Sequence, residues 1–235
     1  MGAPSILIIR GASALPKFYQ PVVDAVTKYG IDIQALHLPS VGLESREAKP
    51  GPPPTLQDDS VFIARHVASL ADAGHDVTLV THSYGGAPAT ESVRGLSKAS
   101  RQEQGLDGGI VRIAYTTSLI PALGQPPCLT KLAERSFTEF PLEKGKLWAG
   151  RLVKHSGASC ASPLTYSGYK DVPVSYLFCE GDHTIPPFIQ QNGIDMIERE
   201  TGKKVDITRI DSDHCPPLSH PELVIDWIVK LAETK

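Results

Sequence analysis

Hydrophobic and polar positions follow two alternating periods along this chain. Short runs rich in Val, Ile and Leu, bounded by Gly, Pro or Asp, are typical of strands buried in a parallel sheet. Longer stretches between them repeat apolar residues every three or four positions, as amphipathic helices do. The sequence therefore predicts a parallel sheet flanked by helices. Six strands are expected, at Ser5–Arg10, Asp32–Leu38, Val77–Thr81, Ile110–Thr117, Pro173–Cys179 and Val205–Ile210.

Three amphipathic helices are predicted, each with a recognisable terminal signal. The first, Pro16–Tyr29, ends before a glycine, which suits the left-handed backbone that follows many helices. The second, Thr55–Ala73, opens with Thr and Asp at the spacing of a capping box. The last is expected to run from Ser219 to Lys235, with Ser219 and Glu222 forming another capping box.

Two segments interrupt this alternation. Pro39–Pro54 contains five prolines and two glycines, which predicts an extended surface loop. Pro121–Asp171 has weak periodicity and lies between two predicted strands. An insertion at the carboxyl edge of a parallel sheet is where a cap over a ligand site would lie. We expect Trp148 of this insertion to contact a substrate, although its ring would serve equally well to pack the insertion onto the body.

Composition and charge narrow the range of partners. The chain has 235 residues and a formal net charge of −3, which fits one domain over residues 1–235. No basic run or long apolar segment predicts a nucleic-acid or membrane partner. The four cysteines form no CxxC pair and no secretory leader is evident, so we expect reduced thiols in a cytoplasmic protein. The scattered Cys and His residues lack ligand spacing, and we expect no metal and no organic cofactor.

The strongest local motif is Leu79-Val-Thr-His-Ser-Tyr-Gly-Gly86, which follows a predicted strand and opens a predicted helix. A nucleophile elbow needs this strand–turn–helix context and small neighbours around its serine, here Ser83. Gly85 meets that need, whereas Thr81 stands where the G-x-S-x-G pattern has its first glycine. A phosphate-binding loop is the alternative, but it requires a lysine that does not follow here. Ser83 is therefore interpreted as a nucleophile.

A serine hydroxyl becomes a good nucleophile when a base takes its proton and a carboxylate orients that base. Asp182 follows a predicted strand, and His214 lies between the last strand and the last helix. Both positions are at the carboxyl edge of the sheet, where catalytic groups collect. Imidazole titrates near neutrality, which suits His214 to accept and return a proton. Asp182 could instead cap a helix or make a turn, and Glu180 is the nearest rival carboxylate.

The other histidines are expected to have packing or surface roles. The side chain of His82 should point away from the neighbouring serine as a packed, hydrogen-bonded residue. His220 is expected at the start of the last helix, and His183 at the surface. Four more fit strand, helix or surface positions without a chemical role: His37, His66, His75 and His155.

Four motifs occur in an order that resembles the α/β-hydrolase superfamily: Arg10-Gly11, His82-Ser-Tyr-Gly-Gly86, Asp182 and His214-Cys-Pro. The nearer likeness is to its cofactor-free branch, which includes plant methyl esterases and hydroxynitrile lyases, and to small fungal hydrolases. The fungal likeness is strongest in Ser162–Tyr166, Val172–Cys179 and Pro186–His214. The resemblance implies a minimal six-stranded, mostly parallel sheet in the order 2-1-3-4-5-6, with flanking helices and a short cap over about residues 121–171.

The resemblance also implies roles for individual residues. Ser83 is the expected nucleophile, His214 the general base and then acid, and Asp182 the carboxylate that orients it. The backbone N–H groups of Ala12 and Tyr84 would stabilise the oxyanion.

The loop after the first strand departs from the family, which usually has His-Gly where Arg10-Gly11 stands here. Because backbone groups act in this loop, replacing histidine by arginine does not change the expected mechanism. It leaves open how the loop is held in position. Ser13 is a candidate substrate contact, or else it caps the helix that follows.

These features predict hydrolysis of a small, largely apolar ester or lactone through an acyl-enzyme. One alternative is a lyase in which Ser83 and His214 only move protons. Such lyases tend to need a cationic residue over the site. Four lysines are available, but nothing in the sequence indicates that any of them points into the site: Lys131, Lys144, Lys146 and Lys154. The other alternative is a non-catalytic ligand-binding module, against which the presence of all three triad residue types argues. The expected partner is a small molecule in each case.

Overall fold

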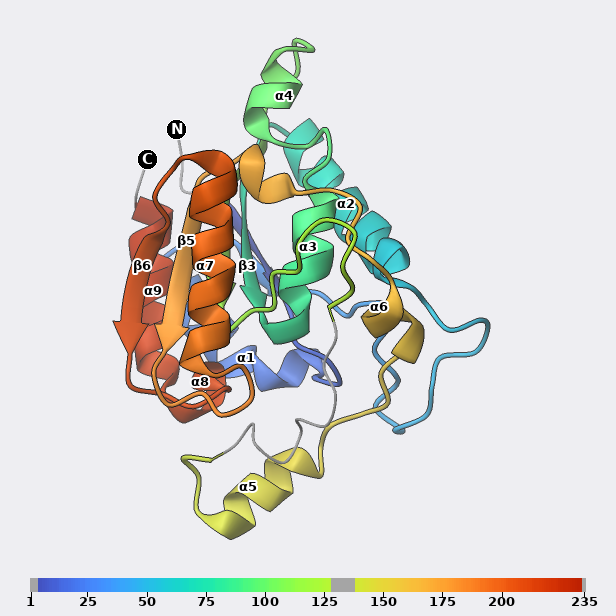
Figure 1. The fold of residues 1–235 in the computed structure, drawn as a ribbon, viewed down its shortest axis with the longest axis vertical. Coiled ribbons are helices and arrows are strands. Elements are labelled where there is room, and N and C mark those ends of the chain that lie inside the picture. The colour runs from blue at the N-terminus through green and yellow to red at the C-terminus, as the bar shows by residue number, and fades with distance from the viewer. Residues whose placement is uncertain (1–3, 128–137, 234–235) are drawn as a thin grey trace.

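Figure 1 shows the computed structural model of the protein, which describes residues 4–127 and 138–233. Six strands form one sheet in the order β2-β1-β3-β4-β5-β6, and each neighbouring pair is parallel. The predicted fold class and strand order are confirmed. The strands are β1 (Ser5–Ile9), β2 (Ile33–Ala35), β3 (Asp76–His82), β4 (Gly109–Thr116), β5 (Val174–Cys179) and β6 (Asp206–Ile210).

Helices cover both faces of the sheet. Helix α1 packs against α9 and α2 against α3, while α3 and α7 lie in front of the sheet in Figure 1 and α9 lies behind it. The helices are α1 (Gln20–Thr27), α2 (Leu56–Asp72), α3 (Gly86–Ser92), α4 (Lys98–Gln102), α5 (Leu142–Ala149), α6 (Gly157–Ala161), α7 (Pro187–Thr201), α8 (Pro216–Ser219) and α9 (Pro221–Glu233). Short 3-10 turns occur at η1 (Pro16–Phe18), η2 (Ser83–Gly85) and η4 (Gly168–Lys170).

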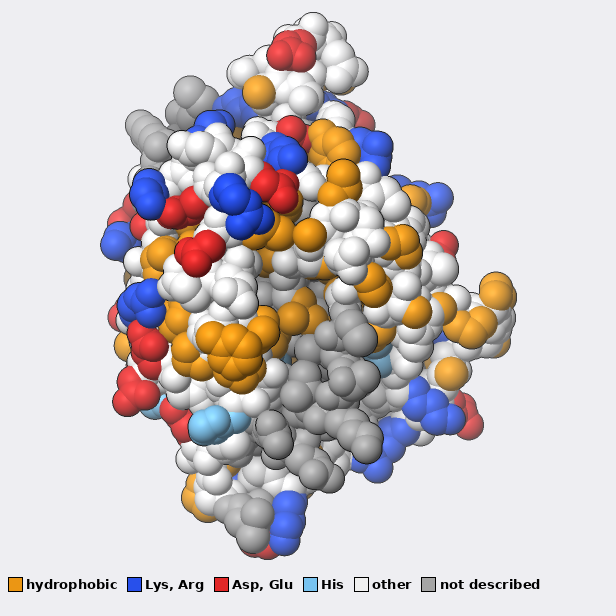
Figure 2. Space-filling view, in the orientation of Figure 1, with side chains coloured by type: hydrophobic (Ala, Val, Ile, Leu, Met, Phe, Trp, Pro, Cys, Tyr) orange, Lys and Arg blue, Asp and Glu red, His pale blue; other side chains and the backbone are white. Residues whose placement is uncertain are grey.

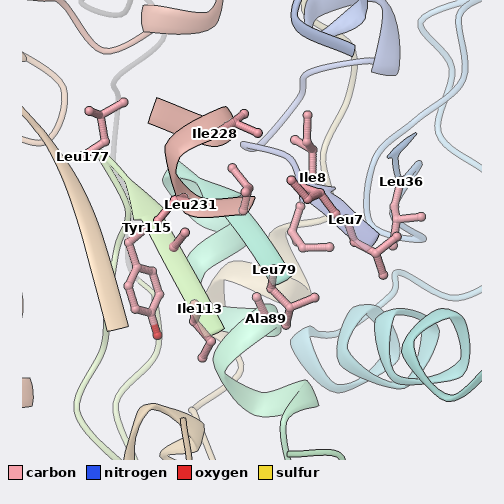
Figure 3. Close-up of a cluster of buried hydrophobic side chains, with 14 of the residues drawn as sticks. Leu7, Ile8, Leu36, Leu79, Ala89, Ile113, Tyr115, Leu177, Ile228 and Leu231 are labelled. Carbon is pink, nitrogen blue, oxygen red and sulfur yellow. The ribbon is translucent and has the colours of Figure 1, made fainter. Parts of the chain in front are cut away.

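The core lies between the sheet and these helices. All residues of β1 and β5 are buried, as expected for parallel strands covered on both faces. Figure 3 shows side chains from four strands in one cluster with α9: Leu7, Leu79, Ile113, Leu177, Ile228 and Leu231. This packing gives the loops at the carboxyl ends of the strands a rigid support.

The predicted helix termini are partly confirmed. The Thr55 side chain accepts the Asp58 amide and the Asp58 carboxylate accepts the Thr55 amide, which is the predicted capping box of α2. The predicted start of the last helix at Ser219 is wrong, because α8 ends there and α9 begins at Pro221. The Ser219 hydroxyl donates to Asp213 Oδ1 at 2.8 Å instead. Proline suits the first position of a helix because no amide donor is needed there.

The first predicted helix is divided. A 3-10 turn over Pro16–Phe18 precedes α1, which has proline in its first turn. The chain leaves this region through Gly30 at φ +75°, the left-handed conformation that the glycine was expected to provide.

The insertion between β4 and β5 packs against the proline-rich loop. Pro39–Pro54 has no helix and only an isolated bridge at Val41, so the predicted loop is confirmed. The Ser156 hydroxyl donates to the Pro54 carbonyl at 2.6 Å, and the Gly42 amide donates to the Lys154 carbonyl at 2.8 Å. These contacts position the segment before α6, whereas α5 extends away from the body in Figure 1.

The surface has no region dominated by one sign of charge on the face seen in Figure 2, where Lys/Arg and Asp/Glu side chains intermingle. This mixture agrees with the formal net charge of −3. Across residues 4–127 and 138–233, no helix is both long enough and apolar enough to cross a bilayer.

Candidate active site

Ser83 lies at the tip of a sharp turn between β3 and α3. Its φ of +53° is in the left-handed region, which is uncommon for a residue with a side chain and is the expected strain of a nucleophile elbow. A Cβ atom on Gly85 would lie 2.2 Å from the Ile9 carbonyl oxygen, so only glycine fits this position. The strand–turn–helix context predicted for Ser83 is confirmed.

Thr81 replaces the first glycine of the elbow pattern without disturbing the turn. Its side chain is buried, and its hydroxyl is 2.8 Å from the hydroxyl of Ser118, two residues after the end of β4. Ser118 is small and supplies a polar partner, so the threonine is accommodated with its hydrogen bond made.

Ser83, His214 and Asp182 form one hydrogen-bonded chain. His214 Nε2 is 3.0 Å from Ser83 Oγ, and His214 Nδ1 is 2.9 Å from Asp182 Oδ2. Because a carboxylate accepts hydrogen bonds, Nδ1–H donates to Asp182, which leaves Nε2 to accept the Ser83 proton. All three side chains are buried, with exposed fractions of 1–4%. The structure thus brings together the three residues that the sequence analysis selected.

Asp182 is oriented by its own turn. Its Oδ1 accepts the amides of Thr184 at 2.7 Å and Ile185 at 2.8 Å, while Oδ2 faces His214. Asp182 therefore fulfils both predicted roles: its Oδ1 makes the turn, and its Oδ2 contacts His214. Glu180, the rival carboxylate, points away and pairs with Arg209 at 2.8 Å.

The loop after β1 lies directly against the elbow. A Cβ atom on Gly11 would lie 3.2 Å from Ser83 Cβ, so the glycine permits the close approach that was expected. Ala12 lines the pocket, and its N–H has no hydrogen-bond partner among the described residues. Tyr84 occupies the first turn of η2, where amides lack partners within the helix.

Arg10 fastens this loop. Its buried guanidinium donates to the carbonyl of Ala14, at the far end of the loop, and to the carbonyl of Leu36, directly after β2. Burial lowers the pKa of Arg10 to about 10, so the side chain remains charged at neutral pH. The arginine that replaces the family's usual histidine thus has a structural role in shaping the loop.

A pocket of about 280 Å³ opens above Ser83. Its wall is mainly apolar, with a few hydroxyl, thiol and imidazole groups, and its lining in the described part of the chain includes no Lys or Arg. Ser13, the candidate substrate contact, lines the pocket and has φ +61°. The lining residues are Gly11–Ala14, Phe18, Tyr19, His82, Ser83, Leu152, His155–Gly157, Cys160, Thr184, His214, Cys215, Pro217 and Leu218.

Trp148 is placed behind the pocket wall. Its ring centroid lies 5.2 Å from that of Phe18, which lines the pocket, whereas Trp148 does not line it in the described residues. The guanidinium of Arg151 stacks over the indole, with its Cζ 4.5 Å from the ring centroid. Any influence of Trp148 on a ligand in this arrangement passes through Phe18.

His155 was expected to have no role at the site, and the structure places it in the pocket wall. Its ring lies edge-on to Tyr84 at 4.7 Å, and its Nε2 is 3.0 Å from the Ser159 hydroxyl. Burial, with a smaller effect of Arg10, lowers the pKa of His155 to about 4, so the ring is neutral at neutral pH. The sequence carried no signal for this position, because it depends on the insertion folding back over the elbow.

The remaining histidines are largely where they were expected. His183 is exposed. His82 is buried and hydrogen-bonded, with Nδ1 2.7 Å from Tyr19 Oη and Nε2 2.7 Å from the His214 carbonyl. His220 lies between α8 and α9 and pairs with Glu139 at 2.8 Å. Among the described residues, no three Cys, His, Asp or Glu side chains gather in a way that would bind a metal ion.

The sequence matches the alpha/beta hydrolase family over residues 6–227. Probable hydrolase R7 from Phoma sp. is 30% identical over 254 residues, which cover 99% of this chain and 99% of that protein.

Two solved structures have the same fold. One is an extracellular alpha/beta-hydrolase from a Paenibacillus species, described as sharing structural and functional homology with tobacco salicylic acid binding protein 2. It superposes with a TM-score of 0.76 at 16% identity and covers 98% of this chain and 100% of its own. The other is a mutant of polyneuridine aldehyde esterase. It has a TM-score of 0.74 at 15% identity, and the match covers 98% of this chain and 99% of the esterase.

The parallel sheet with the elbow after β3 has the α/β-hydrolase fold, and the family match together with the hydrolase relatives identifies an enzyme of the hydrolase class. The chain belongs to the alpha/beta hydrolase family.

Proposed function

We propose that this hydrolase cleaves a small, largely apolar ester or lactone through an acyl-enzyme formed on Ser83. The observation that carries the proposal is the continuous hydrogen-bonded chain from Asp182 through His214 to Ser83 at the floor of the pocket. His214 accepts the proton of Ser83 as its oxygen attacks the carbonyl carbon, and then gives that proton to the leaving alcohol. Asp182 orients the ring and stabilises the imidazolium that forms. Water attacks the acyl-enzyme in the second half of the reaction, with His214 again as the base.

The negative charge on the substrate oxygen is stabilised by the N–H groups of Ala12 and Tyr84 in this mechanism. The close approach of Gly11 to Ser83 and the lack of a partner for the Ala12 amide in the described chain support this assignment. Such donors act strongly because the surroundings are preorganised and shielded from water.

The substrate class follows from the pocket. Its size suits a small molecule, and its mainly apolar wall favours an apolar acyl or alcohol group. A carboxylate or phosphate on the substrate would find no Lys or Arg among the described lining residues, so we expect a neutral ester or lactone. Ser13 is the expected polar contact, and Trp148 acts through Phe18. The esterase among the structural neighbours agrees with ester chemistry.

The lyase alternative is less well supported. Three of the four lysines that the sequence analysis considered, Lys144, Lys146 and Lys154, do not line the pocket. The fourth, Lys131, lies outside the described residues.

Intact-mass measurement after rapid acid quenching tests the proposed reaction. We expect the enzyme mixed with p-nitrophenyl acetate to gain one acetyl group, which peptide mapping places on Ser83. Turnover of the ester without any covalent species, in quench times from milliseconds to seconds, would contradict the acyl-enzyme. Turnover in the Ser83→Ala variant at the unaltered rate would contradict the role of Ser83.

A further inference from the structure

His82 precedes Ser83 in the chain, yet its ring bonds to two other loops. One nitrogen, Nδ1, is 2.7 Å from Tyr19 Oη, and the other, Nε2, is 2.7 Å from the carbonyl oxygen of His214. Tyr19 Oη is in turn 3.2 Å from the amide nitrogen of Gly11. One residue therefore connects the nucleophile turn, the loop that follows β1 and the loop that contains His214.

Every proton in this chain can be assigned from the chemistry of its members. A carbonyl oxygen only accepts, so His82 Nε2 carries the proton and donates to His214. In a neutral imidazole Nδ1 is then the acceptor, and the Tyr19 hydroxyl donates to it. Tyr19 Oη also accepts the Gly11 N–H. The chain runs in one direction, from Gly11 N–H through Tyr19 O–H and the His82 ring to the His214 carbonyl.

The surroundings favour these protonation states. Burial, together with the nearby His214, lowers the pKa of His82 to about 3, so the ring stays neutral across the ordinary pH range. Burial raises the pKa of the Tyr19 phenol, which therefore retains its proton. The rings of His82 and His214 are 5.0 Å apart, so a neutral His82 also avoids a second positive charge beside the imidazolium that catalysis forms.

We infer that His82 and Tyr19 are positioning residues that couple the oxyanion loop to the loop of the general base. This inference rests on the proposed function. Gly11 immediately precedes Ala12, the expected oxyanion donor, so a hydrogen bond to the Gly11 amide limits where the Ala12 amide can lie. The other end of the chain binds the backbone of the base itself. Displacing an oxyanion donor by a fraction of an ångström weakens binding of the transition state more than binding of the substrate.

The oxyanion loop and the loop of the general base depend to different degrees on this chain of hydrogen bonds. The Gly11 amide has Tyr19 Oη as its hydrogen-bond acceptor and no other acceptor among the described residues, so loss of the hydroxyl leaves this buried amide without a protein partner. The His214 carbonyl also accepts the Thr117 hydroxyl at 3.3 Å. Loss of the Tyr19 hydroxyl should therefore affect the oxyanion loop more than the loop of the base.

Kinetics per active site, counted by titration with a serine-directed fluorophosphonate, test the coupling. Tyr19→Phe should lower kcat by about 10-fold with KM changed by less than about 2-fold, a smaller loss than removal of a whole oxyanion donor causes. His82→Leu should lower kcat at least as much. His82→Gln presents one donor and one acceptor at similar spacing and should recover most of the activity. The matched control is Tyr115→Phe, which removes a buried hydroxyl bonded to Thr90 away from the pocket and should leave kcat per site unchanged.

The outcomes separate this inference from the proposed function. If the unaltered protein is not labelled at Ser83, the proposed function fails. If it is labelled and turns over but Tyr19→Phe keeps its full kcat, or loses no more than Tyr115→Phe, the coupling alone is refuted.

A second measurement needs no substitution. In the ¹⁵N NMR spectrum of the unaltered protein, His82 should show a protonated Nε2 and a hydrogen-bonded, unprotonated Nδ1, with no titration between pH 5 and 9. A proton on Nδ1 would reverse the chain and overturn the inference.

Discussion

The pocket has two walls that differ in how their polar groups are bonded. Loops at the carboxyl edge of the sheet form one wall, in which Ser83, His214, Asp182 and His82 are joined by hydrogen bonds of 2.7–3.0 Å. Residues 152–160 of the insertion contribute the other wall, where His155 Nδ1 is buried without a partner in the described chain. Farther out, α5 meets the body through the contact between Trp148 and Phe18.

This difference indicates a division of tasks. The hydrogen bonds that join Ser83, His214, Asp182 and His82 hold the reacting groups in fixed positions, as catalysis requires. The insertion wall contributes shape and a mixed apolar surface, which select among substrates without taking part in proton transfer. Changes in the wall formed by the loops at the carboxyl edge of the sheet, called the sheet wall below, should therefore lower kcat. Changes in the insertion should alter KM.

The largest effect is expected when Ser83 or His214 is replaced by alanine. Either change removes the nucleophile or its base, and kcat for a p-nitrophenyl ester should fall by about 10⁵-fold or more, with KM little changed. Steady-state kinetics on folded protein measures this. A loss below about 10²-fold would mean that the sheet wall does not carry the chemistry.

A somewhat smaller loss is expected for Asp182→Asn. The amides of Thr184 and Ile185 still have an oxygen to bind, but the ring of His214 loses the acceptor that sets its tautomer. We expect kcat to fall by about 10⁴-fold. Glu180→Gln is the control, because Glu180 pairs with Arg209 at the surface and should not affect kcat. Equal losses in the two variants would contradict the assignment of the carboxylate.

Gly85→Ala tests the packing of the elbow rather than its chemistry. The added methyl group would meet the carbonyls of Ile9 and Arg10 at 2.2 and 2.6 Å, and backbone atoms of a central strand cannot move aside easily. The free energy of unfolding in urea should fall by about 3 kcal/mol or more. Gly157→Ala, where a Cβ meets nothing within 4 Å, should change stability by less than about 0.5 kcal/mol. A stable Gly85→Ala variant would show that the elbow can shift.

Acid should destabilise both walls through their buried histidines. The pKa of His82 is lowered to about 3 and that of His155 to about 4, whereas each is near 6.5 in the unfolded chain. Below pH 6.5 the unfolded state binds more protons, so the free energy of unfolding decreases as the pH falls toward these values. Each histidine contributes at most about 1.4 kcal/mol per pH unit. Urea unfolding at pH 7, 6 and 5 measures the slope, and His155→Gln should make it shallower; an unchanged slope would contradict the buried neutral ring.

The smallest effect is expected in the insertion. Trp148→Ala removes the ring that supports Phe18 from behind, so KM for an apolar ester should rise by about 5-fold while kcat stays within about 2-fold. Leu147→Ala on the same helix removes a side chain that is 54% exposed and should change neither constant. A large fall in kcat for Trp148→Ala would remove the distinction between the walls.

The sequence predicted the sheet wall well because its signals are local. Each strand has its own apolar run, and Ser83, Asp182 and His214 each follow a strand, so the parallel sheet brings their loops to one edge. Gly85 is a local signal of the same kind, because a glycine in this motif indicates a position where the turn leaves no space for a side chain.

The features that could not be predicted depend on contacts between distant segments or on backbone partners. His155 reaches the pocket only because the insertion packs on the proline-rich loop. Arg10 donates to two backbone carbonyl groups. Because every residue has a backbone carbonyl, the sequence does not indicate which residues Arg10 binds. Ser219 matched a capping box, but Asp213 competes for its hydroxyl and the helix begins later.

The most direct test of the account is covalent labelling of the protein with a fluorophosphonate probe, followed by mass spectrometry of its peptides. We predict one adduct per chain, located on Ser83, which is lost in Ser83→Ala and strongly slowed in His214→Ala. Absence of an adduct on folded, unaltered protein, or labelling that persists when Ser83 is replaced, would contradict the claim that the sheet wall activates this serine.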